Sequence, residues 1–156
     1  MTVEPDLAIR VLNEALQAKF HSLARYILES SPYATRADAP LVEALERIAA
    51  EDEAQAREIT AQIEALDGIP ATGLPDPMVT EIAYLAVGGL ARQCAEGKRQ
   101  EAARMRRSLE ALGGNAGPGG LASAQALLQR LAEADLGQAE ALEKALEVCP
   151  EQRQNC

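Results

Sequence analysis

A chain of 156 residues is long enough for one sizeable hydrophobic core, and we expect a single domain over residues 1–156. Only 3% of the residues are aromatic, which argues against β-sandwiches and barrels, whereas the many Ala, Leu, Glu, Gln and Arg residues favour helices. A net charge of −9 repels nucleic-acid phosphates, and no stretch has the pattern of a secretion signal or the length of a membrane span. We therefore expect an acidic, all-helical, cytoplasmic protein that binds neither nucleic acid nor membrane.

The first half of the chain predicts two helices, at residues 6–30 and at about 40–66, because apolar residues recur there at helical spacing. Turn-forming sequences, SP at 31–32 and DGIP at 67–70, end them. The residues expected to face inward are Leu12, Leu16, Leu23 and Ile27 in the first helix and Leu41, Leu45, Ile48, Ile59, Ile63 and Leu66 in the second.

The second half predicts two more helices after a long link. Residues 70–77 contain three prolines and one glycine, which excludes a helix there and leaves a link long enough to cross a bundle. The third helix ends at the glycine-rich run 113–120, and the fourth extends from about 121 to 148. Their inward residues are Val87, Leu90, Cys94, Met105, Leu109 and Leu112, and then Leu128, Leu131 and Leu142.

Two short links and one long middle link predict an antiparallel four-helix bundle with a crossover between its second and third helices. We place its core at residues 6–148 and a polar tail at 149–156. Three cysteines match no zinc spacing and are odd in number, so a disulfide framework is not expected. Cys94 is predicted to pack in the core, and Cys149 and Cys156 are assigned no role.

Polar residues interrupt the apolar stripe of every predicted helix at mid-length. The two halves also match when Asp52 is set over Asp135, which suggests a pseudo-twofold repeat. Because 33 residues separate Lys19 from Asp52 and 34 separate Glu101 from Asp135, two hairpins of similar length would bring the polar residues to one level. A helix rotated by one position would instead expose them to solvent. The members of this polar belt are Lys19, Asp52, Gln55, Glu101, Asp135 and Gln138.

Two sequence motifs carry a resemblance to a known family. LNEAL at 12–16, followed by Tyr26, is similar to the opening helix of a bacterioferritin, and EALDGIP at 64–70 is similar to the end of its second helix. Over roughly residues 7–146 the chain resembles the ferritin-like superfamily, in particular its bacterioferritin and rubrerythrin branches. The resemblance implies a di-iron site built from one Glu on each of two helices and a Glu-x-x-His pair on each of the other two.

The belt departs from that family pattern at most positions. The resemblance puts a carboxylate ligand at Lys19, Glu–His pairs at Asp52/Gln55 and Asp135/Gln138, and a bridging Glu at Glu101, the one position that matches. A protonated amine cannot bind a metal ion, and a carboxamide is a poor ligand for ferrous iron compared with imidazole. Glu53 stands where a bacterioferritin has its haem-binding Met, so haem is not implied. We predict a degenerate di-iron site without a cofactor.

The charges of the belt do not balance. Lys19 brings one positive charge against the three carboxylates of Asp52, Glu101 and Asp135. Uncompensated buried charge is strongly disfavoured, so the remainder must be protonated, hydrated or paired with another cation. Desolvation and mutual repulsion should raise the pKa of at least one carboxyl. The sequence thus predicts a water-filled polar network with Lys19 at its centre.

We interpret the chain as a ferritin-like scaffold without ferroxidase activity, which acts through assembly, as a homodimer or larger homo-oligomer, or through a protein partner. An enzyme is the less favoured interpretation. It would use one divalent metal such as iron, held by Asp52, Glu101 and Asp135, or a radical on Tyr26. A further alternative is a subunit of an iron-storage shell. Apart from that redox role, we expect the Tyr26 hydroxyl to bond a carboxylate, and His21, off the apolar stripe, to be a surface residue.

Overall fold

The computed structural model describes residues 3–75, 86–113 and 120–149. Its helices are α1 (Val3–Phe20), α2 (Leu23–Glu29), α3 (Ala39–Ala65), α4 (Val87–Leu112) and α5 (Gly120–Val148), with a 3-10 turn at Arg36–Asp38 before α3. No strand is found in those three ranges, and the prediction of an all-helical protein is confirmed. None of the described helices is both long and apolar enough to cross a membrane.

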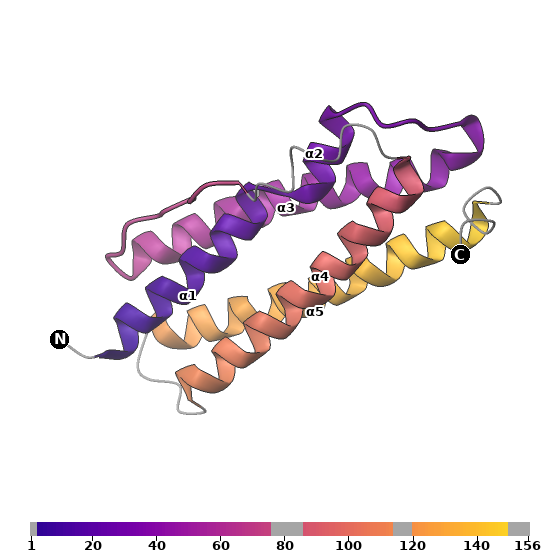
Figure 1. Ribbon diagram of the computed structural model, residues 1–156. Coiled ribbons are helices and arrows are strands. Elements are labelled where there is room, and N and C mark those ends of the chain that lie inside the picture. Colours follow the sequence, from indigo (N-terminus) through magenta and orange to yellow (C-terminus); the bar gives the residue numbers. More distant parts are fainter. Residues whose placement is uncertain (1–2, 76–85, 114–119, 150–156) are drawn as a thin grey trace.

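The prediction of one continuous helix at residues 6–30 is wrong, because the chain breaks there into α1 and α2 (Figure 1). The break falls at His21 and Ser22, where the Ser22 backbone adopts φ −55° and ψ 121°. Serine favours such a position because its hydroxyl can cap the first turn of the next helix. Ser22 Oγ accepts a hydrogen bond from the Arg25 amide at 3.5 Å. The break also leaves the Ser22 side chain in the interior, where the residue is buried.

The other predicted helix ends lie close to where the sequence placed them. α3 stops as the turn sequence predicts, but the left-handed residue is Asp67, with φ 58°, and not the glycine after it. The amide of Gly68 donates to the carbonyl of Ile63 at 2.9 Å and that of Asp67 to Glu64 at 3.0 Å, so the last carbonyls of the helix are satisfied. α4 ends at Gly113, whose φ of 78° a glycine adopts without strain.

The link that follows α3 is held by three polar side chains spaced four residues apart, two in α1 and one directly after it. Asn13 Nδ2 donates to the Ile69 carbonyl at 3.2 Å, and Gln17 Nε2 donates to the Leu74 carbonyl at 3.1 Å. His21 Nε2 lies 3.2 Å from the Gly73 carbonyl oxygen. Figure 1 shows this segment returning along α1, so α1 positions the first part of the connection. The expected link at 70–77 lies only partly within the described residues, because these end at residue 75 on this side.

The four long helices lie side by side in Figure 1. The colours show α1 and α5 running in one direction and α3 and α4 in the other. α4 packs along α5, α1 packs along α3, and α3 also packs against α5. The short helix α2 contacts α3 and α4.

Apolar side chains form two clusters with a polar layer between them. Along the chain, the change from one cluster to the other falls around Lys19, Asp52, Lys98 and Asp135. Cys94 is buried as predicted, and Cys149 is buried in the second cluster, so the core continues past the predicted limit at residue 148. The first cluster includes Leu12, Leu16, Ile59, Ile63, Met105, Leu128 and Leu131; the second includes Ile27, Leu41, Leu45, Ile48, Leu90, Cys94 and Leu142.

Candidate functional site: a buried lysine–carboxylate network

The polar layer is a network of two lysines and two aspartates, one from each long helix. Lys98 Nζ lies 2.6 Å from Oδ1 and 2.8 Å from Oδ2 of Asp52, and 3.5 Å from Oδ1 of Asp135. Lys19 Nζ lies 3.4 Å from Oδ1 of Asp52 and donates a hydrogen bond to Oδ1 of Asp135. All four residues are buried, with at most 4% of their surface exposed. Both ammonium groups are therefore shared between both aspartates.

The two aspartates are not equally satisfied. Asp52 accepts hydrogen bonds on both oxygens, because Ser22 Oγ donates to its Oδ2 at 2.7 Å in addition to the lysines. Asp135 is bonded through Oδ1 alone, and its buried Oδ2 has no hydrogen-bond partner among the described residues. The helix break at Ser22, which the sequence analysis did not foresee, supplies the additional donor to Asp52.

Glu101 lies at the edge of the network. Its Oε2 is 4.0 Å from Lys19 Nζ, which is an ion pair but too long for a hydrogen bond. That oxygen is enclosed and without a hydrogen-bond partner among the described residues, although 20% of the whole side chain is exposed. Burial raises the pKa of Glu101 above its usual range; Lys98 and Lys19 act against the rise, and Asp135 and Asp52 add to it. The predicted raised carboxyl pKa is therefore found at Glu101.

Lys98 belongs to the network but was not among the residues predicted from the sequence. It lies four residues after Cys94 and seven before Met105, so helical spacing alone places it on the inward stripe of α4. Burial alone would lower the pKa of Lys98, but the surrounding carboxylates outweigh burial and hold that pKa above its ordinary value. The predicted excess of two negative charges is corrected to one. A proton on Glu101 would neutralise the whole network.

The two belt glutamines have other surroundings. Gln138 is buried, and its Nε2 donates to Oε2 of Glu51 at 2.7 Å. Gln55 is half-buried. The Oε1 atoms of both amides are enclosed and lack a hydrogen-bond partner within the described ranges. The structure thus joins Lys19, Asp52, Glu101 and Asp135 as expected, and adds Lys98 and Ser22 in place of contacts from the amides.

The donor set does not fit the di-iron centre that the family resemblance implies. Both oxygens of Asp52 and Oδ1 of Asp135 already accept hydrogen bonds from two ammonium groups, which are donors only and cannot share a metal ion with these carboxylates. Across the part of the chain that is described, no three His, Cys, Asp or Glu residues are grouped as metal ligands. Cys94 next to the network does not supply a thiolate, because burial raises its pKa to about 12.

Tyr26 and His21 form a pair of their own. The expected bond from the Tyr26 hydroxyl to a carboxylate is not found; this hydroxyl lies 3.1 Å from His21 Nδ1. His21 is half-buried, and its ring lies between Tyr26 and the Gly73 carbonyl. A neutral imidazole with its proton on Nε2 satisfies both contacts, because Nδ1 then accepts from the tyrosine.

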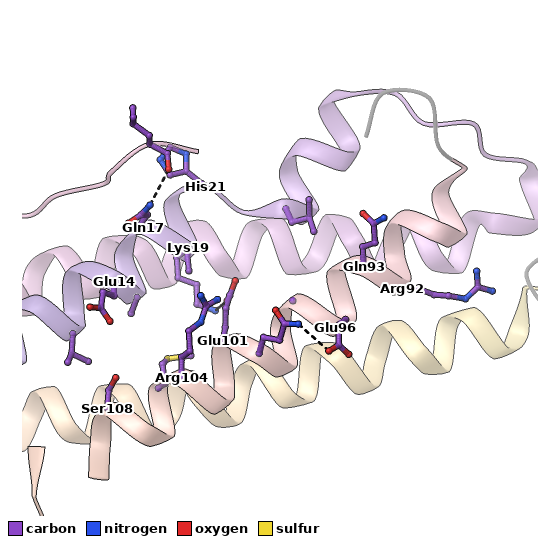
Figure 2. A pocket seen from close by; sticks show the side chains of 18 residues that line it. Glu14, Gln17, Lys19, His21, Arg92, Gln93, Glu96, Glu101, Arg104 and Ser108 are labelled. Carbon is purple, nitrogen blue, oxygen red and sulfur yellow. Dashed lines mark hydrogen bonds and ion pairs between the residues drawn. The ribbon is translucent and has the colours of Figure 1, made fainter. Parts of the chain in front are cut away.

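A cavity of about 750 Å³ opens between α1 and α4 beside the network (Figure 2). Lys19 and Glu101 line it and point toward each other from the two helices. Its apolar wall includes Val11, Ala15 and Met105. Charged and amide side chains such as Glu14, Gln93, Glu96 and Arg104 complete the lining.

Comparison with protein-family models, curated proteins and solved structures finds no match to this chain. The geometry of its own residues is therefore the basis for a functional proposal.

Proposed function

We propose that this protein is a ferritin-like, antiparallel four-helix bundle in which a lysine–carboxylate network stands in place of a di-iron centre. It would act in the cytoplasm as a scaffold without ferroxidase activity, through self-assembly or a protein partner. The opposed directions within the pairs α1/α3 and α4/α5, and the long connection from α3 to α4, support the fold.

The contact of Lys98 with both oxygens of Asp52 is the observation that carries the proposal. A metal ion at Asp52 would have to displace this ammonium group, which the neighbouring carboxylates hold in its charged form. Lys19 presents the same obstacle at Asp135. Replacing hydrogen-bonded ammonium groups inside a buried network leaves like charges facing one another, which is costly.

A network of this kind suits a structural role. It lies between the two apolar clusters and joins all four long helices through directional contacts, so a helix shifted by one turn would leave buried charges unpaired. We propose that the network specifies the register of the helices. Light scattering would measure whether a dimer or a larger homo-oligomer forms.

Iron loading tests the absence of a di-iron centre. We expect protein incubated with ferrous iron and oxygen, then desalted, to show no stoichiometric iron by elemental analysis and no ferroxidase activity. Uptake of two irons per chain would overturn the proposal. An electron paramagnetic resonance signal that disappears in Tyr26→Phe would favour oxidative chemistry instead.

A constructive test uses two matched variants. The first combines Lys19→Glu, Gln55→His and Gln138→His, which restores the family ligand types but keeps Lys98. The second adds Lys98→Met. If Lys98 is the remaining obstacle, only the second should gain iron affinity, measured by elemental analysis after circular dichroism has established that both variants are helical. Equal iron uptake by both variants would show that Lys98 does not exclude the metal.

A further inference from the structure

The cavity between α1 and α4 has the size and lining of a small-molecule site. Its volume of about 750 Å³ lies within the range of ligand pockets in proteins. Val11, Ala15 and Met105 give it an apolar wall, and Glu101 gives it a carboxylate that is partly exposed. An apolar wall beside this carboxylate suits a ligand with an aliphatic body and a polar end that can bind the carboxylate.

Glu101 is the carboxylate through which the network meets this cavity. The side chains of Lys19, Asp52 and Asp135 are fully enclosed, whereas 20% of the Glu101 side chain is exposed. With Glu101 ionised, the two lysines face three carboxylates, and one negative charge remains uncompensated. A cation that reaches Glu101 from the cavity would compensate that charge. A carboxylate ligand would add a second negative charge beside it.

The residues around the cavity do not supply this compensation themselves. Arg104 of α4 and Glu14 of α1 both line the cavity, and their charges offset one another. No ion pair joins Arg104 to Glu101 within 4.0 Å among the described residues. An ammonium group can both neutralise the charge and donate a hydrogen bond to the partly exposed Glu101 carboxylate, whereas an alkali cation gains nothing from the apolar wall.

We propose that the cavity between α1 and α4 binds a primary aliphatic amine, with its ammonium group on the Glu101 carboxylate and its alkyl chain along Val11, Ala15 and Met105. This site goes beyond the proposed scaffold role and does not depend on it. Absence of amine binding would overturn the amine site and leave the scaffold role standing, whereas iron uptake would overturn the scaffold role, so the two proposals are tested by different measurements.

Titration calorimetry with n-hexylamine tests the site, with n-hexanoate as the anionic counterpart. We expect saturable binding of the amine, weaker or no binding of the carboxylate, and about a threefold to fourfold gain in affinity for each added methylene of the alkyl chain. Glu101→Gln, which keeps the shape of the side chain, should weaken amine binding by about tenfold or more. Tighter binding of hexanoate than of hexylamine would overturn the proposal.

Two further variants separate the site from general attraction to an acidic protein. Glu110→Gln removes one negative charge from α4 outside the cavity and should leave the affinity within about twofold, since that residue is exposed and does not line the cavity. Gly97→Leu should block the site without unfolding the helix, because a Cβ at Gly97 would have no atom within 4 Å and this glycine lines the cavity. Equal binding by wild type, Glu101→Gln and Gly97→Leu would show that the amine binds elsewhere.

Proton release gives an independent readout. The groups around Glu101 are Lys19 from α1, Asp52 from α3, Lys98 from α4 and Asp135 from α5, and together with burial they leave its pKa raised. An amine that takes the place of the proton must release it, so calorimetric heats should depend on the ionisation enthalpy of the buffer. Affinity should rise with pH until Glu101 is ionised in the free protein. A Glu101→Gln variant with the same proton release would contradict the assignment.

Discussion

The middle of α3 and the middle of α5 carry the same motif, an aspartate followed three residues later by a glutamine. The side chains of the two motifs nevertheless make different hydrogen bonds. Asp52 is bonded on both oxygens, whereas Asp135 is bonded on one. Gln138 of α5 donates a hydrogen bond to Glu51 of α3. The residue that corresponds to Glu51 in the second half is Ala134, so the repeat offers Gln55 no equivalent partner. A repeated motif therefore acquires unequal roles when the chain around it is not repeated.

The largest expected difference between the two halves is in how far replacing each aspartate lowers the free energy of unfolding. Asp52→Asn should lower the free energy of unfolding by about 3–5 kcal/mol, because it leaves Lys98 without its closest counter-charge in the interior. Asp135→Asn should cost less, about 1–3 kcal/mol, because only one of its oxygens is bonded. Urea unfolding measures both, with the exposed Glu53→Gln as a control near zero. An equal loss for the two aspartates would contradict the asymmetry.

Glu101 should make the stability of the network depend on pH. The pKa of Glu101 is higher in the folded protein than the ordinary 4.5 of the unfolded chain. The stability that Glu101 contributes is therefore complete below pH 4.5 and is lost as pH rises through the folded-state pKa. The free energy of unfolding should fall across that window by at most about 1.4 kcal/mol per pH unit. Glu101→Gln should flatten this part of the profile. A profile that is identical in wild type and variant would rule out Glu101 as its source.

Ser22 provides the next test, because it is the donor that Asp52 has and Asp135 lacks. Ser22→Ala removes the 2.7 Å hydrogen bond to Asp52 and the cap of α2, and should cost about 1–2 kcal/mol. Ser30→Ala at the other end of α2 is the matched control, since its hydroxyl bonds only the Ile27 carbonyl. Thermal unfolding of the two variants should rank Ser22→Ala as the less stable. The opposite order would show that the bond to Asp52 contributes little.

The smallest expected effect concerns a position where the two halves differ in backbone propensity. Gly137 in α5 corresponds to Ala54 in α3, and both are exposed. A Cβ at Gly137 would have no atom within 4 Å. Gly137→Ala should therefore stabilise the protein by about 0.5–1 kcal/mol, and Ala54→Gly should destabilise it by a similar amount. Chemical denaturation would detect both, and destabilisation by Gly137→Ala would indicate a contact that the structure does not contain.

Much of the helical content could be read from the residues alone. Apolar spacing and turn sequences placed α3, α5 and the end of α4 to within a few residues, and the inward stripe led to Lys19, Asp52, Glu101 and Asp135, which do meet. Lys98 lies on the same stripe but was not predicted to be buried. A lysine at one inward position of a helix that also contains many arginines has the sequence pattern of a surface residue.

The sequence pattern within one helix was sufficient to predict which face of that helix is buried, because a period of 3.6 residues assigns every side chain to a face. Contacts between helices required the assembled chain. Ser22 reaches Asp52 only because the first helix breaks beside α3, and the Tyr26 hydroxyl meets His21 for the same reason. The opening beside Glu101 likewise depends on the distance that packing leaves between α1 and α4, and the residue pattern of either helix contains no such distance.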